Sequence, residues 1–204
     1  MLTRINFPSS VDQRVLPADV LSRIKHDCSR IEAFQDRWDR PQIEQFVAAD
    51  YSHVYQVLDW TLETQIVTGR RFLEWGCGFA VVSSFASRFD LDVIGIEAEQ
   101  ELLVEGHKTT QAWKVSAELI QGNFLPPGSD SLADDPTLPS LGHPVPDAYE
   151  QLELDLDDFA IVYSYPWPGE DDFHEAVFDR YAGVGSLLIL FCGPNDIRVW
   201  RKVR

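Results

Sequence analysis

Cysteine is scarce in this sequence. Its three cysteines, Cys28, Cys77 and Cys192, are odd in number and far apart, so they suit neither a disulfide framework nor a Cys-x-x-Cys metal pair. The first residues lack the apolar core of a signal peptide, and no stretch approaches the ~18 uninterrupted apolar residues of a membrane span. We therefore expect reduced thiols in a cytoplasmic protein with no membrane association.

Basic residues are also few. The chain has 17 Lys and Arg against 33 Asp and Glu, which gives a formal net charge of −16. Nucleic-acid affinity depends largely on Lys and Arg that displace counterions from phosphates, so we expect no nucleic-acid partner. The charge suits a cationic or neutral ligand, and the composition leaves the oligomeric state open.

Much of the negative charge lies in one segment, residues 126–158, which holds nine acidic residues, six prolines and no Lys or Arg. Proline removes backbone donors and charge opposes burial, so we expect this acidic insert to be a mobile, solvated loop that folding does not require. Two interpretations stay open: a loosely packed surface insert, and a lid that gates a substrate.

From residue 70 to 204 the hydrophobic pattern alternates between short apolar runs and amphipathic stretches, which favours an α/β domain with a doubly wound, mostly parallel sheet. One returning strand after a Gly-Pro-Asn-Asp turn gives about six strands and a shortened C-terminal end. The expected strands are 71–75, 92–96, 118–121, 159–163, 186–191 and 197–203, and the expected helices are 79–89, 99–114 and 170–181.

Residues 1–69 are expected to form a helical segment packed on this domain. One apolar stripe follows Pro17 and runs to Trp38, and a second helix is expected to open at Pro41 and to end at Gly69. The connector 46–51 lies between the two stripes.

The most informative stretch is the glycine turn at Glu74-Trp75-Gly76-Cys77-Gly78-Phe79-Ala80. It follows a strand and precedes a helix, and its two glycines allow a tight turn and close approach of a ligand to the unpaired N–H groups of that helix. Glu97 ends the next strand, where a carboxylate can accept hydrogen bonds from both hydroxyls of a ribose.

The turn is not a dinucleotide fingerprint, because Val81 stands at the position of the third glycine in Gly-x-Gly-x-x-Gly. It resembles the first motif of the class I, Rossmann-like S-adenosylmethionine-dependent methyltransferases, acidic-x-Gly-x-Gly-x-Gly. Glu74, Gly76 and Gly78 match this motif, whereas Ala80 replaces its last glycine. A glycine turn with no ligand remains the alternative.

The resemblance implies that S-adenosylmethionine is the cofactor. The segment Gln121-Gly122-Asn123-Phe124 is similar to the family's segment beside the adenine, in which Asn123 would accept from the exocyclic amine. The residues that would bind the cofactor are Glu74, Gly76, Gly78, Phe79, Glu97, Ala98, Asn123, Phe124 and, in the connector, Tyr51.

A second turn, residues 163–170, should lie beside the transferable methyl group, because ligands of open α/β sheets lie beyond the carboxyl ends of the strands. Families that methylate base amines have an Asn-Pro-Pro-Tyr or Asp-Pro-Pro-Trp type of turn here, but Tyr165 replaces the polar residue. We expect Tyr165 and Trp167 to place the acceptor with their ring faces, and Glu170, His174 or Tyr165 to remove a proton. The alternative is that the aromatic rings only roof the pocket.

These features predict methyl transfer to an unidentified small-molecule or protein acceptor, more cationic or neutral than nucleic acid. Two other functions stay open. One is a catalytically silent cofactor-binding protein that acts through partners. The other is a nucleotide-binding oxidoreductase, which Val81 and Glu74 disfavour.

Overall fold

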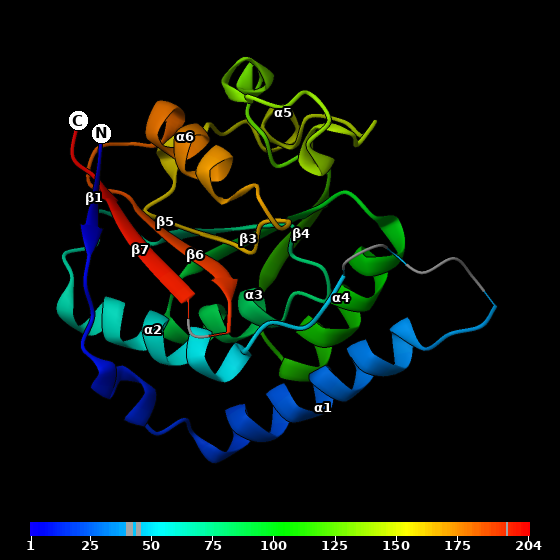
Figure 1. Cartoon of the computed structure of the whole chain (residues 1–204). Helices are drawn as coiled ribbons and strands as arrows, with labels where there is room; N and C mark the ends of the chain where they lie inside the picture. The colour runs from blue at the N-terminus through cyan, green and yellow to red at the C-terminus, as the bar shows by residue number, and fades with distance from the viewer. Residues whose placement is uncertain (40–42, 44–45, 195) are drawn as a thin grey trace.

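A mostly parallel sheet of seven strands lies at the centre of the computed structural model, which describes residues 1–39, 43, 46–194 and 196–204 (Figure 1). The strand order is β1-β7-β6-β5-β2-β3-β4, with β2 to β6 parallel and β7 antiparallel to both of its neighbours. The strands are β1 Leu2–Ile5, β2 Arg71–Trp75, β3 Asp92–Glu97, β4 Ala117–Gln121, β5 Ile161–Ser164, β6 Leu187–Gly193 and β7 Asp196–Lys202.

Helices cover both faces of the sheet, as Figure 1 shows. The first face packs against α1, α2, α3 and α4, and the second against α5 and α6. Side chains alternate along each strand, so that Phe72 joins the first core while Leu73 and Trp75 join the second. The helices are α1 Ala18–Gln35, α2 Tyr51–Thr64, α3 Val81–Ala86, α4 Gln100–Trp113, α5 Ala148–Leu152 and α6 Asp171–Tyr181, with 3-10 turns at Ser9–Gln13, Ser87–Phe89, Ser129–Leu132, Pro139–Leu141 and Leu156–Asp158.

The expected α/β class and doubly wound sheet are confirmed, but the expected count of strands was too low by one. The extra strand is β1, which pairs antiparallel with β7 from Leu2 opposite Lys202 to Ile5 opposite Val199. The two termini therefore lie side by side (Figure 1), with the N–H of Val203 donating to the carbonyl of Met1 over 3.0 Å. Residues 1–69 are thus not purely helical. Strand β1 forms the edge of the sheet, next to the hairpin of β6 and β7.

Two helix boundaries also differ from expectation. Helix α1 ends at Gln35, so Trp38 lies beyond it and its side chain is fully exposed. Helix α2 begins at Tyr51, where the carboxylate of Asp50 accepts a hydrogen bond from the N–H of His53 over 3.0 Å. Pro41, the expected start, lies outside the described residues.

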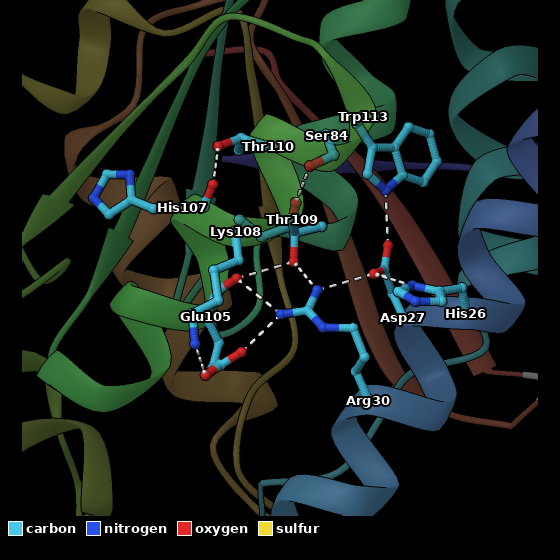
Figure 2. Close-up of polar contacts among 11 residues, drawn as sticks. His26, Asp27, Arg30, Ser84, Glu105, His107, Lys108, Thr109, Thr110 and Trp113 are labelled. Atoms are coloured by element: carbon cyan, nitrogen blue, oxygen red, sulfur yellow. Dashed lines mark hydrogen bonds and ion pairs between the residues drawn. The ribbon is translucent and has the colours of Figure 1, made fainter.

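A polar cluster holds α1 against α4 (Figure 2). The Arg30 guanidinium lies at its centre and donates to the Glu105 carboxylate over 2.7 Å, to the Thr109 hydroxyl over 2.9 Å and to the Asp27 carboxylate over 3.1 Å. The Trp113 indole N–H donates to the other oxygen of Asp27 over 2.7 Å. Because Asp27 is buried, its charge requires these partners, and the cluster fixes how the N-terminal helix docks.

The acidic insert is not the solvated loop that its composition predicted. It folds over the second face of the sheet, where Ala148, Tyr149 and Leu156 are buried in the core. Three of its acidic residues cap short helices: Asp147 accepts from the N–H of Tyr149 over 2.8 Å, and Asp155 and Asp158 form a capping box. Composition was misleading because the exposed acidic residues alternate with leucines that pack on the core.

Among the described residues, no helix combines the length and apolar character needed to cross a membrane.

We predict that the insert contributes to stability. Leu156→Ala should lower the free energy of unfolding by about 2–5 kcal/mol, because it removes a fully buried side chain from the core. Leu154→Ala, at a half-buried position two residues away, is the matched control and should cost clearly less. Urea unfolding followed by tryptophan fluorescence measures both, and equal losses would mean that the insert does not complete the core.

Candidate ligand site at the carboxyl edge of the sheet

A cavity of about 980 Å³ opens where the parallel strands end. Its size is at the upper end of the ~300–1,000 Å³ typical of small-molecule sites. The chain leaves β2 toward β3 and β4 on one side and returns to β5 and β6 on the other, so β2 and β5 border the topological switch point. Ligands of open α/β sheets bind in this crevice.

The glycine turn between β2 and α3 forms part of the cavity wall. Gly76, Gly78 and Ala80 all have left-handed backbones, with φ of 66°, 52° and 53°. A Cβ on Gly76 would meet no atom within 4 Å, so that this residue presents bare backbone to open space. Ala80, at the position of the motif's last glycine, thus takes a left-handed backbone that glycine adopts more readily than alanine.

Glu97 at the end of β3 lies against this turn. Its Oε2 accepts a hydrogen bond from the N–H of Gly78 over 2.7 Å, and its Oε1 accepts one from the N–H of Glu99 over 2.9 Å. The side chain is buried, burial raises its pKa, and the residue lines the cavity. A carboxylate has about four lone-pair sites, so Glu97 can still accept from two hydroxyls of a ligand.

Glu74 faces the start of α3. Its Oε2 accepts from both the N–H and the hydroxyl of Ser83, over 2.7 and 2.5 Å, and the residue also lines the cavity. Desolvation by burial raises the pKa of Glu74 to about 8, although the hydrogen bonds from Ser83 oppose the shift. Glu74, the acidic residue of the motif, therefore holds the first turn of α3 and also borders the cavity.

The predicted adenine contact is only partly in place. Phe124 lines the cavity and stacks on Trp75 with ring centroids 5.4 Å apart. Asn123, however, does not line it, and its side-chain oxygen accepts from the N–H of Leu125 over 2.9 Å. This is the turn-forming use of Asn, and it corrects the expected contact with adenine.

The N-terminal segment supplies another wall. Tyr51, the first residue of α2, lines the cavity as predicted, as does Ala98 after β3. Phe79 differs from its prediction, since its ring is buried in the core between Phe34 and Phe46 and does not line the cavity. The ring of Phe46 also covers Gly78, where a Cβ would approach it to 2.8 Å.

The turn after β5 brings Tyr165 and Trp167 to the cavity, as predicted. Tyr165 packs edge-on against Phe191 with ring centroids 4.7 Å apart, and burial raises its pKa. These rings lie on the β5–β6 side of the cavity, away from Glu97 on β3.

Glu170 is not on the cavity wall, which corrects its expected role as a base. Its buried carboxylate accepts from the N–H and hydroxyl of Ser140 over 2.9 and 2.5 Å, and so anchors the insert to α6. His174 does line the cavity, and its Nδ1 lies 2.8 Å from the hydroxyl of Ser164. The other ring nitrogen of His174, Nε2, lies 3.5 Å from the carboxylate of Glu170. Ser164 and Glu170 stand at the two ends of the turn after β5, so His174 links these ends.

No protein-family model and no curated protein matches this sequence. Among solved structures, a "putative O-methyltransferase" from Klebsiella pneumoniae superposes with a TM-score of 0.51 over 88% of this chain and 68% of its own, at 17% identity. The chain has the fold of the class I methyltransferases.

Two further solved structures also match this chain. An RNA methyltransferase from Salinibacter ruber gives a TM-score of 0.45 at 17% identity, over 71% of this chain and 88% of its own. An S-adenosylmethionine-dependent methyltransferase from Clostridium acetobutylicum gives 0.41 at 10% identity, over 66% of this chain. This chain spans about half the length of several such structures, 46% in the Clostridium case and 58% in a Pyrococcus horikoshii protein.

The charges around the cavity of this methyltransferase fold are one-sided. Its lining includes the carboxylates of Glu74, Glu97, Glu99, Glu101 and Asp171, and no Lys or Arg within the described part of the chain. No cluster of three or more metal-binding side chains occurs within that part either. A lining with acidic side chains and no basic ones favours a cationic ligand over an anionic one.

Sequence reasoning missed Trp75, Tyr163, Ser140 and Cys192 as parts of the wall. Tyr163 had a usable signal, because it ends the expected strand two residues before Tyr165, and the alternation of side chains would put both on one side of the sheet. Ser140 had none, since its place depends on how the insert folds.

We predict that Glu74 makes stability depend on pH. The folded protein keeps the Glu74 proton to about pH 8, whereas the ordinary value is 4.5. The unfolded chain binds fewer protons between these values, so the free energy of unfolding should fall as pH rises from about 4.5 to 8. Glu74→Gln should flatten this fall, although Glu97 contributes in the same direction. Chemical denaturation at a series of pH values tests it, with the exposed Glu118→Gln as control; parallel profiles for Glu74→Gln and wild type would contradict it.

Proposed function

We propose that the protein binds S-adenosylmethionine in this cavity and transfers its methyl group to a small-molecule or protein amine. The observation that carries the proposal is the placement of the Glu97 carboxylate against the glycine turn at the carboxyl edge of the sheet. The fold and the motif Glu74-x-Gly76-x-Gly78 point to the same class of cofactor.

The residues present fit this group. The bare backbone at Gly76 leaves room for close approach, Glu97 has acceptor sites left for ribose hydroxyls, and the ring of Phe124, backed by Trp75, offers a face for an adenine. Val81, in the place of the third glycine of a dinucleotide site, is buried in the core. These features favour an adenosyl sulfonium over a nicotinamide dinucleotide.

The cofactor would supply an electrophilic methyl carbon. The acceptor nitrogen would bond to it as the carbon–sulfur bond breaks, the sulfur would keep the electron pair of that bond, and the proton of the nitrogen would pass to solvent. Positioning supplies much of the catalysis in such a displacement. Tyr165 and Trp167 hold the acceptor against the methyl group, and His174 keeps their turn in place. The aromatic walls exclude water from the reacting atoms.

The acceptor proposed is cationic or neutral. Carboxylates border the cavity, and the ring faces of Tyr165 and Trp167 attract an ammonium group. A nucleic-acid acceptor would bring phosphates toward these carboxylates.

Glu97→Gln tests the cofactor site. It keeps the size of the side chain but removes the charge that accepts from the ribose, so S-adenosylhomocysteine should bind about 10- to 150-fold more weakly, or ~1.5–3 kcal/mol. Calorimetry measures the affinity, and Glu118→Gln is the control at an exposed site on β4. Equal affinities of Glu97→Gln and wild type would exclude Glu97 from the cofactor site.

Tyr165→Ala and Trp167→Ala test the acceptor wall. Each should lower the rate of methyl transfer from labelled donor to cell extract by at least 10-fold, and should leave donor affinity within about twofold. Loss of donor affinity with an unchanged rate per bound donor would reassign the turn to the cofactor. Labelled nucleic acid as the main product would refute an amine acceptor.

A further inference from the structure

One buried polar group on the cavity wall has no partner. Tyr163 on β5 is 3% exposed and lines the cavity, yet its hydroxyl makes no hydrogen bond within the described residues. Buried hydroxyls are nearly always paired, because an unpaired one loses its hydrogen bonds to water and gains none. Such a group beside a cavity points to a ligand that completes it.

Tyr163 lies at the switch point of the sheet. It is the direct neighbour of Glu74 across the β2–β5 pair, and of Ile189 on β6. Tyr165, in the turn two residues further along, packs against the same core as Tyr163. Glu97 lies on β3, on the far side of β2, so Tyr163 borders the acceptor end of the cavity and not the ribose end.

The groups around Tyr163 select the chemistry of that ligand. Glu74, its neighbour on β2, already accepts two hydrogen bonds from Ser83 and keeps its proton to about pH 8, so it offers a ligand no charged acceptor. Tyr51, Tyr165 and Cys192 line the same cavity. A hydroxyl that can accept and several aromatic faces, in a lining with acidic residues and no basic side chain among the described residues, match an N–H donor on an apolar body.

We propose that the Tyr163 hydroxyl binds the amine nitrogen of the methyl acceptor and accepts a hydrogen bond from one of its N–H groups. The assignment rests on the proposed methyl transfer and specifies its substrate as a primary or secondary amine on an aromatic or aliphatic body. The hydroxyl is buried in the wall, so neighbouring side chains must shift when the amine enters.

Tyr163→Phe separates this role from a structural one, because it deletes only the hydroxyl. The probes are phenethylamine, 2-phenylethanol and phenylacetate, which share a body and differ in charge. They are titrated calorimetrically into the full chain with and without saturating S-adenosylhomocysteine. Phenethylamine should bind at least 10-fold more tightly than the other two, and Tyr163→Phe should weaken it at least 10-fold while S-adenosylhomocysteine affinity stays within twofold.

Thermal stability is the second readout. Deleting an unpaired hydroxyl should leave the Tm of Tyr163→Phe equal to or above that of wild type. Tyr149→Phe is the matched control, since its equally buried hydroxyl donates to the carbonyl of Phe124 over 2.7 Å and accepts from the Trp75 indole over 3.0 Å. That variant should lose several degrees of Tm.

Three results would overturn the assignment. They are no preference for phenethylamine, equal phenethylamine affinity in wild type and Tyr163→Phe, and a fall in Tm for Tyr163→Phe like that of Tyr149→Phe. Failure of S-adenosylhomocysteine to bind would instead remove the proposed methyl transfer. In that case, Tyr163-dependent binding of phenethylamine would still identify an amine site.

Discussion

The bond between the Glu97 carboxylate and the N–H of Gly78 is the constraint on which the site depends. It joins the end of β3 to the glycine turn after β2, and the second oxygen of Glu97 holds the N–H of Glu99 just before α4. One side chain therefore fixes two of the loops that border the cavity. Its burial means that this carboxylate must keep hydrogen-bond donors around it, whether from the backbone or from a ligand.

The first helical layer supports the same turn from outside. Gly106 of α4 lies so close to it that a Cβ there would be 3.1 Å from the carbonyl oxygen of Gly78. The Arg30 cluster in turn holds α1 on α4, and the Arg30 guanidinium lies 5.2 Å from the centre of the Phe79 ring. The N-terminal helices are thus part of the structure that shapes the cavity.

The cavity has two chemically different ends. Glu97, the glycine turn and Phe124 lie on the β2–β4 side, while Tyr163, Tyr165 and Trp167 lie on the β5–β6 side. Glu74 stands between them on β2. This division suits a reaction in which one ligand donates a group to another across the switch point, and it is the reason why we assign the unpaired hydroxyl to the acceptor.

How far the sequence could predict this arrangement varies with the kind of signal. The strands around the glycine turn were predictable, because buried parallel strands read as apolar runs and the turn needs glycine. Strand β1 was not, since four residues with one pairing partner carry almost no periodic signal.

The insert was misjudged for a different reason. Its prolines and acids describe an exposed chain on average, but its individual leucines and Tyr149 decide the packing. Asn123 and Glu170 have residue types suited to a ligand site, and only the fold shows that Leu125 and Ser140 already occupy their side chains.

The most direct test of the account is a calorimetric titration of the purified chain with S-adenosylmethionine and, separately, with NAD⁺. The account predicts saturable binding of one S-adenosylmethionine per chain and no detectable binding of NAD⁺, because the turn lacks the third glycine that a pyrophosphate site uses. Binding of NAD⁺ in preference to S-adenosylmethionine would contradict it.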